Sequence, residues 1–179
     1  MADTLRGQFD ERVSAFIEAS AGLTPFGFAF VENRYQFLTA SAERIFTPDL
    51  LEDFVDRIRE WADGAVGASH VSTPQTRIYI SGCSRNLLRD EVSAPWHYLL
   101  PLSRAHPQHK NRKIGHVKVL TSSIPCGNGE KVSVDRVVSS DLNFNQLLVH
   151  KTENPYSVTP TRVSANPFEG LVFLDGYLW

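Results

Sequence analysis

Hydrophobic residues change their spacing along the chain. In the first part they recur every three or four positions, which is typical of amphipathic helices. From Arg77 onward they form short runs with alternating polar residues, which is typical of strands. These runs are residues 77–80, 97–102, 114–120, 132–138, 145–149 and 171–174. Six or more strands at this spacing favour a sandwich or a barrel over a parallel α/β sheet.

The first helix is predicted from about residue 4 to residue 21, with Gly22 as its terminator. Its apolar residues fall on one face, namely Leu5, Phe9, Val13, Phe16 and Ile17. Residues 26–30 and 35–37 then alternate aromatic side chains with other residues. We expect them to form a first pair of strands across Glu32-Asn33-Arg34.

The second helix has a clearly marked start. Thr47 is suited to cap its first amides, Pro48 to its first helical position and Asp49 to the positive end of its dipole. Gly64 is its predicted end. The wide apolar stripe predicts a helix packed on a sheet, and consists of Leu50, Leu51, Phe54, Val55, Ile58, Trp61 and Ala62.

Length and turn chemistry indicate one domain. A chain of 179 residues with 42% hydrophobic content can bury a sizeable core. Gly127-Asn128-Gly129 predicts a tight turn between two strands, because Asn-Gly readily adopts positive φ. We therefore expect a single domain over 1–179, with a helical part at 1–70 that holds the strand pair and a β-barrel part at 71–179.

Charge and composition exclude several function classes. The net charge of −2 argues against a nucleic-acid surface, and the basic run at 110–113 is interpreted as a solvated loop. No apolar run reaches the roughly 18 residues that span a membrane, and no signal segment is recognised, so a cytoplasmic protein is expected. Cys83 and Cys126 lack metal-type spacing and are expected to be free thiols.

Common catalytic motifs are missing from the sequence. It contains no P-loop, no dinucleotide glycine fingerprint, no G-x-S-x-G elbow and no H-E-x-x-H helix. The adjacent residues Asp90 and Glu91 would point to opposite faces of a strand, which makes them a poor acid/base couple. Candidate chemistry therefore lies in histidines, tyrosines and carboxylates distributed over the predicted strands.

The order of elements in the second half resembles a known family. Residues 77–83 read Arg-Ile-Tyr-Ile-Ser-Gly-Cys, and a loop ending Leu88-Arg89-Asp90 and the run 96–102 follow. This succession resembles the prolyl-hydroxylase-like 2-oxoglutarate/iron(II) oxygenases, in which a strand brings a His-x-Asp pair to the metal. Residues 145–150 followed by Tyr156 resemble the segment that delivers the distal histidine, and residues 170–179 resemble the closing strand.

The resemblance implies a fold and a pair of cofactors. The implied fold class is α+β, a double-stranded β-helix (a jelly-roll or cupin-like barrel) with N-terminal helices packed outside. The implied cofactors are iron(II) and 2-oxoglutarate, and the candidates for holding the co-substrate are Tyr79, Tyr98 and Arg162. Family members place an arginine about ten residues after the distal histidine; here Asn166 stands at that place.

Carried over position by position, the family's metal ligands change identity. The first histidine position holds Leu88, the carboxylate position holds Asp90 and the distal histidine position holds Tyr156. Iron(II) of this class needs two imidazoles and one carboxylate. On this alignment only the carboxylate is kept.

A shifted alignment keeps a complete ligand set. Asp90, His97 and His150 could converge as metal ligands, with His116 as a fourth candidate, because neighbouring strands of a small barrel aim side chains at one lumen. Alternation in 114–120 places His116 outside together with Lys118. For His97 the pattern favours neither face.

Three functions follow from these alternatives. The leading hypothesis is an enzyme that oxidises a small molecule on the oxygenase-like scaffold, with Asp90, His97 and Tyr156 as catalytic candidates. The second is a metal-free member of that scaffold that acts as an isomerase or cyclase, or as a binding or partner protein. The third is a structural jelly roll. The expected partner is a small-molecule substrate, without nucleic acid or membrane, and the sequence leaves a homo-oligomer open. The apolar run 171–179 is expected to dock, either closing the barrel or meeting a partner.

Overall fold

The computed structural model describes most of the chain. The described residues are 1–20, 29–30, 35–79, 84–88, 90–104, 115–121, 124–125, 131–132, 136–160 and 170–179. Within them lie helices α1 (Ala2–Ser20) and α2 (Pro48–Val66) and a short 3-10 turn, η2 (Ala42–Arg44). The strands are β1 (Ala29–Phe30), β2 (Tyr35–Gln36), β3 (Leu38–Ser41), β4 (Gln75–Tyr79), β5 (Ser84–Leu88), β6 (Trp96–Pro101), β7 (Gly115–Thr121), β8 (Ile124–Pro125), β9 (Lys131–Val132), β10 (Arg136–Leu142), β11 (Leu148–Lys151), β12 (Tyr156–Pro160) and β13 (Leu171–Leu178).

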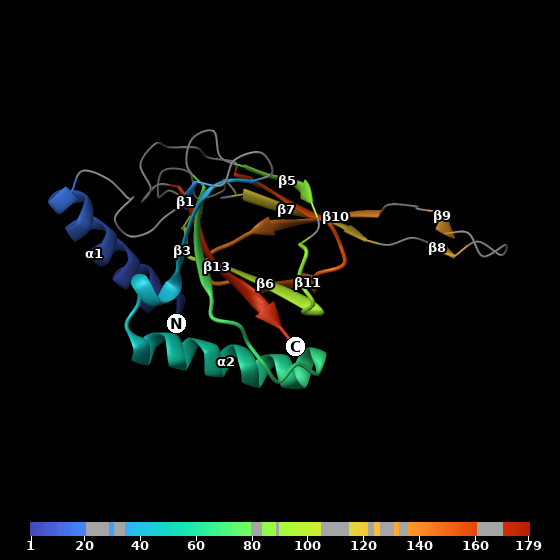
Figure 1. The fold of residues 1–179 in the computed structure, drawn as a ribbon, viewed down its shortest axis with the longest axis horizontal. Helices are drawn as coiled ribbons and strands as arrows, with labels where there is room; N and C mark the ends of the chain where they lie inside the picture. Colours follow the sequence, from blue (N-terminus) through green and yellow to red (C-terminus); the bar gives the residue numbers. More distant parts are fainter. Residues whose placement is uncertain are drawn as a thin grey trace.

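The strands form two main antiparallel sheets that face each other (Figure 1). One sheet has the order β1-β3-β4-β13-β6-β11, and the other has the order β10-β7-β12-β5-β2. From β4 to β7 and again from β10 to β13, consecutive strands alternate between the sheets. This alternation is the winding of a double-stranded β-helix, so the predicted fold class is confirmed.

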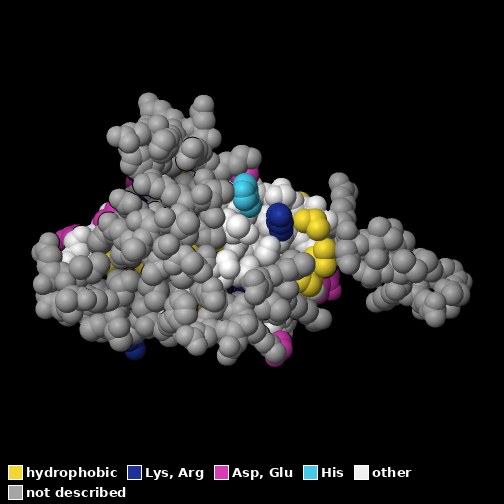
Figure 2. All heavy atoms as spheres, turned by 90° about the horizontal axis from the view of Figure 1, so that it is seen from above, with side chains coloured by type: hydrophobic (Ala, Val, Ile, Leu, Met, Phe, Trp, Pro, Cys, Tyr) yellow, Lys and Arg dark blue, Asp and Glu magenta, His cyan; other side chains and the backbone are white. Residues whose placement is uncertain are grey.

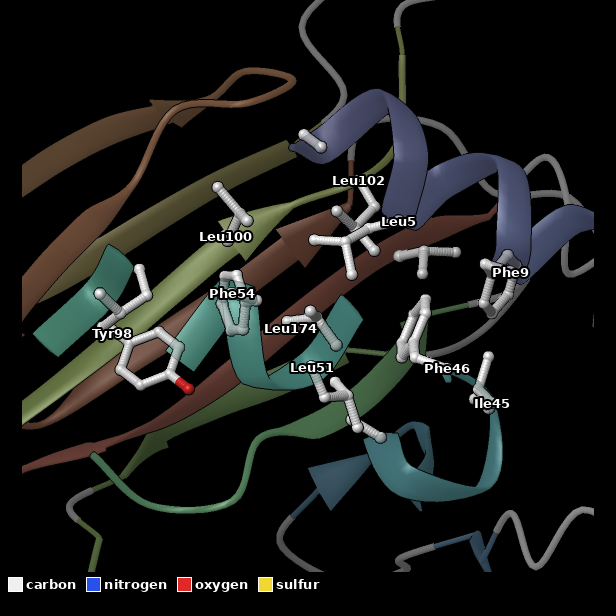
Figure 3. Packing of buried hydrophobic residues seen from close by; sticks show 14 of the residues in the cluster. Leu5, Phe9, Ile45, Phe46, Leu51, Phe54, Tyr98, Leu100, Leu102 and Leu174 are labelled. Atoms are coloured by element: carbon white, nitrogen blue, oxygen red, sulfur yellow. The ribbon is translucent and has the colours of Figure 1, made fainter. Parts of the chain in front are cut away.

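Both helices lie on the outer side of the six-stranded sheet (Figure 1). Side chains of a strand alternate between its two faces, so this sheet supports two separate clusters. The cluster under the helices includes Leu5 and Phe9 of α1, Phe54 of α2 and Leu174 of β13 (Figure 3). Burying each such side chain contributes about 1.5–3 kcal/mol. The cluster between the sheets consists of Phe37, Tyr79, Leu99, Val117, Val119, Leu142, Tyr156, Val158, Leu171 and Phe173.

Both helices occur where the hydrophobic pattern predicts them, but their ends differ. The prediction that Gly64 ends α2 is wrong, because the helix continues to Val66 and Gly67 closes it at φ 69°. Thr47 precedes Pro48 as predicted but makes no side-chain capping bond. Its amide donates instead to the Gln8 side chain of α1 at 3.1 Å, which ties the two helices together. Neither of these helices is long and apolar enough to span a membrane.

The predicted N-terminal strand pair is wrong. Strand β1 pairs with β3 in the six-stranded sheet, whereas β2 pairs with β5 in the other sheet. The helical part therefore adds strands to both sheets. The alternation of aromatic residues over 26–37 predicts strands, but it does not show whether they pair with each other or join different sheets. The hairpin around residues 127–129 is supported by antiparallel pairing of β8 with β9 and of β7 with β10, while its turn lies outside the described residues.

Strand β13 lies in the middle of the six-stranded sheet, between β4 and β6. Trp179, which follows the strand, is also fixed, because its amide donates to the His70 carbonyl and its carbonyl accepts from the amides of Ser69 and His70. The prediction that this segment docks is confirmed, and it does so inside the six-stranded sheet.

Gly176 of β13 provides a direct test of how tightly this strand fits. A Cβ atom built there would lie 2.6 Å from the Tyr98 hydroxyl and 2.8 Å from Ser72 Oγ. Ser72 Oγ already accepts the Tyr177 amide at 2.9 Å, so neither neighbour can move without cost. We expect Gly176→Ala to lower the free energy of unfolding by about 1–3 kcal/mol in urea titration.

The matched control for that variant is Gly64→Ala. An added Cβ in this part of α2 meets no atom within 4 Å, so the free energy of unfolding should stay the same or rise by up to about 1 kcal/mol. Equal effects of the two substitutions would contradict the close packing of β13.

Candidate functional site in the barrel interior

Most charged side chains of the described chain are exposed, and a few are buried inside it. The face in Figure 2 shows its coloured acidic and basic side chains singly, without a patch of one sign among the described residues. The space between the sheets, in contrast, holds a cluster of titratable groups. They are Arg77, Tyr79, Arg85, Asp90, His97, His150, Tyr156, Asp175 and Tyr177.

His97 lies at the centre of this cluster. It is fully buried on β6, and the register places it opposite His150 of β11 on one side and Tyr177 of β13 on the other. Its Nδ1 lies 3.1 Å from His150 Nε2, and its Nε2 lies 3.0 Å from Asp175 Oδ2. These three side chains form a line, which we call the His97 chain. Both ring nitrogens of His97 are therefore engaged by protein groups.

The far end of the His97 chain is fixed by the backbone. His150 Nδ1 lies 2.9 Å from the Lys151 carbonyl oxygen. Burial, and next the neighbouring His97, lower the pKa of His150 to about 4. His150 is consequently neutral at physiological pH, with the Nδ1 proton directed at the carbonyl and the Nε2 lone pair at His97.

An arginine holds the other end. Arg77 of β4 reaches Asp175 Oδ2 at 2.6 Å, and both side chains are nearly inaccessible to solvent. Burial lowers the pKa of Arg77, but the Asp175 carboxyl and the neighbouring phenols together raise it by more. The pKa of Arg77 therefore lies above its ordinary value. The pair gives the Asp175 carboxyl a cationic partner in a position that solvent hardly reaches.

A second buried ion pair comes from the other sheet. Arg85 of β5 is 2% exposed and reaches Asp90 Oδ1 at 2.8 Å. Its guanidinium carbon also lies 3.8 Å from the centre of the Tyr156 ring. Burial raises the pKa of Asp90, but Arg85, His97 and Arg77 lower it more, so the carboxylate stays charged.

Phenol rings surround the imidazoles. The ring centres of Tyr156 and Tyr177 each lie 5.0 Å from that of His97. Burial raises the pKa of Tyr156 well above its ordinary value, and burial together with the Asp90 carboxylate raises that of Tyr177. Both phenols therefore keep their protons at neutral pH and are hydrogen-bond donors.

Several buried side-chain atoms of this cluster lack a hydrogen-bond partner among the described residues. They include the Tyr156 hydroxyl and Asp175 Oδ1, on side chains that are 1% exposed. Native proteins pair most buried polar atoms with protein groups, water or ligand. The Tyr156 hydroxyl as donor and Asp175 Oδ1 as acceptor can therefore hydrogen-bond to a small polar molecule between the sheets.

The structure brings most of the candidate residues together. The interior cluster contains Asp90, His97, His150, Tyr156 and Tyr79, and the Tyr79 ring stacks on that of Phe173 at 5.4 Å. Burial, as the main cause, raises the pKa of Tyr79.

Two other candidates lie elsewhere, and the position of a third is not described. Tyr98 follows His97 on the strand and so points to the opposite face, where its ring packs beside Phe54 under the helices (Figure 3). His116 faces outward, as predicted, and pairs with Asp141 at 3.1 Å. Arg162 lies outside the described residues.

Four residues of the cluster were not predicted from the sequence: Arg77, Arg85, Asp175 and Tyr177. Two of them carried a usable signal. Asp175 is a lone carboxylate within the apolar run 171–178, and Arg77 alternates with Tyr79 on one face of a predicted strand. A charge in an otherwise apolar strand is rarely buried without a partner, so each could have been proposed as the other's partner. Arg85 lies in a run without strand-like alternation, and we find no signal for it.

Strand pairing tests the alignment with the oxygenases. Leu88 of β5 is the register partner of Tyr156 of β12. These are the two positions to which the resemblance assigns the imidazole ligands, and Asp90 follows two residues after Leu88. The alignment is therefore consistent with the topology, although neither paired residue is a histidine.

Comparison of whole structures identifies the scaffold. AviO1 from Streptomyces viridochromogenes Tue57 superposes with a TM-score of 0.63 at 12% identity, over 99% of this chain and 86% of that one. A Pseudomonas putida prolyl-4-hydroxylase superposes with a TM-score of 0.55 at 16% identity, over 99% and 86%. The chain has the fold of the 2-oxoglutarate/iron(II) oxygenases.

The same scaffold occurs in SnoN, a non-heme α-ketoglutarate-dependent epimerase from nogalamycin biosynthesis. It superposes with a TM-score of 0.57 at 10% identity, over 95% of this chain and 72% of SnoN. No family profile matches the sequence, and no curated protein matches it significantly. At these identities the likeness to oxygenases concerns the fold.

The described interior residues do not fit the iron centre that this fold implies. No three of their histidine, cysteine, aspartate or glutamate side chains are arranged to hold a metal. One nitrogen of His97 contacts His150 and the other contacts Asp175, so the possible metal-ligand atoms of these three side chains point at one another in a line. A metal ion would need their lone pairs to converge on one point. Asp90, the remaining candidate, is held by Arg85.

Proposed function

We propose that this protein is a metal-independent enzyme on the oxygenase scaffold. It would bind a small molecule between the two sheets and promote proton transfer, as an isomerase or cyclase does. The observation that carries the proposal is a buried donor and a buried acceptor without partners, the Tyr156 hydroxyl and Asp175 Oδ1, in a cluster whose imidazoles are not free for a metal.

Each side chain has a chemical role in this proposal. Tyr156 keeps its proton and can donate a hydrogen bond to a carbonyl oxygen of the substrate, which makes an adjacent C–H bond more acidic. Asp175 is paired with Arg77 through Oδ2, and its Oδ1 can accept the proton that leaves. Arg85 over the Tyr156 ring fixes the ring's position. Iron(II), 2-oxoglutarate and a homo-oligomer are not required.

Deuterium exchange tests the proposal without knowledge of the product. The protein, purified and treated with EDTA, is incubated in D2O with a panel of small hydroxy and keto compounds, and proton NMR follows deuterium uptake at carbon. We expect catalysed exchange in at least one compound, and Tyr156→Phe should slow it by about 100-fold or more, since it removes only the hydroxyl.

Tyr98→Phe is the matched control, because Tyr98 is equally buried but faces the helices. It should leave the exchange rate unchanged. The proposal is wrong if no compound exchanges, or if turnover requires added iron(II) and releases succinate from 2-oxoglutarate.

A further inference from the structure

The resemblance to the oxygenases assigns the metal ligands to three positions of this barrel. They hold Leu88 at the end of β5, Asp90 shortly after that strand and Tyr156 at the start of β12. Leu88 and Tyr156 are register partners in the five-stranded sheet. The three positions therefore lie together in the fold, whatever side chains they carry.

The guanidinium of Arg85 contacts the side chains at two of these positions. One of its nitrogens lies 2.8 Å from Asp90 Oδ1, and its carbon lies 3.8 Å from the centre of the Tyr156 ring. Arg85 belongs to the same strand as Leu88 and is 2% exposed. A guanidinium keeps its positive charge in proteins. The place beside Asp90 and Tyr156 consequently holds a permanent cation that the chain itself supplies.

We propose that the Arg85 guanidinium takes the place of the iron ion in this barrel, as a built-in cation that keeps metals out. The carboxylate that would bind a metal is bound by Arg85, and the ring at one of the imidazole positions faces the guanidinium. Histidines at positions 88 and 156 would then not be enough to restore a metal site. The inference goes beyond the proposed function, because it concerns which cation the scaffold holds and not which reaction follows.

Charge and ligand supply both support this inference. A divalent ion beside the Arg85 guanidinium would be repelled, and the repulsion is strong where water is excluded. An iron(II) site of this class also needs the carboxylate that Arg85 engages. The other buried arginine of the interior differs, because Arg77 pairs with Asp175 on the six-stranded sheet at 2.6 Å. Arg77 is therefore a matched control for removing a buried positive charge.

Restoring the imidazoles tests the proposal. In Leu88→His/Tyr156→His, the double-histidine variant, calorimetric titration with Co²⁺ should show no binding beyond that of the wild type. Adding Arg85→Ala should create one Co²⁺ site that binds about 100-fold more tightly or better, because the space and the carboxylate become available. Adding Arg77→Ala instead should create none.

Three results of this titration would overturn the proposal. The first is a Co²⁺ site in the double-histidine variant, in which Arg85 is still present. The second is an equal gain from Arg85→Ala and Arg77→Ala, which would mean that only the net charge of the interior matters. The third is a folded Arg85→Ala triple variant that gains no site.

Chemical rescue tests the same place without added histidines, and it applies even if the triple variants do not fold. Arg85→Ala leaves a space beside Asp90 that free ethylguanidinium can fill. Millimolar ethylguanidinium should raise the thermal unfolding midpoint of this variant by several degrees, or recover its folding if it does not fold alone. Arg57→Ala, at an exposed arginine of α2, should show no rise. No response of Arg85→Ala, or equal responses of the two variants, would contradict the proposal.

Discussion

Replacing Arg85 with methionine is expected to lower the free energy of unfolding by about 3–5 kcal/mol. Asp90, which is 9% exposed, would lose its 2.8 Å partner and remain as an uncompensated buried carboxylate. The stacked contact over Tyr156 at 3.8 Å would be lost as well. Chemical denaturation at pH 7 measures the change.

The double variant Arg85→Met/Asp90→Leu shows whether the loss comes from the isolated charge. Replacing both ions by apolar side chains of similar size is often neutral or stabilising, so the double variant should recover most of the lost stability. A double variant as unstable as the single one would mean that Arg85 acts through packing and not through Asp90.

Arg57→Met is the matched surface control. Arg57 pairs with Asp53 at 2.9 Å in α2, but both side chains are at least half exposed. Exposed pairs contribute about 0–1 kcal/mol, so this substitution should change little. A similar loss at both arginines would contradict the importance of burial.

The sequence predicts where the strands lie better than it predicts which face of each strand points into the barrel. Alternation identifies most of the barrel, because the five-stranded sheet carries polar residues on its outer side, such as His116 and Lys118. On β6 the rule fails, since five of its six residues are buried and both faces look apolar. The direction of His97 relative to Tyr98 therefore had to come from the register with β13 and β11.

The charge network of the site could not be predicted as a network. One of its ion pairs joins Arg77 of β4 to Asp175 of β13, and only the sheet order makes these two strands neighbours. The sequence identified individual polar residues in apolar runs. It could not show that His97 would be engaged at both nitrogens, and that detail argues against a metal centre at these residues.

Acidification from pH 6.5 to pH 4 is expected to remove roughly 3 kcal/mol of stability through His150. The folded protein holds the pKa of His150 at about 4, below the ordinary value of about 6.5. Between these pH values the unfolded chain binds a proton at His150, whereas the folded protein does not. The contribution is therefore fully present above pH 6.5 and is lost as the pH falls toward 4.

Urea titrations at half-unit pH steps measure this slope. In His150→Gln the slope between pH 6.5 and pH 4.5 should be shallower than in the wild type, because no imidazole titrates at that position, whatever the overall stability of the variant. His70→Gln, at an exposed histidine, should keep the wild-type slope. Parallel slopes for the wild type and His150→Gln would show that His150 is not held neutral.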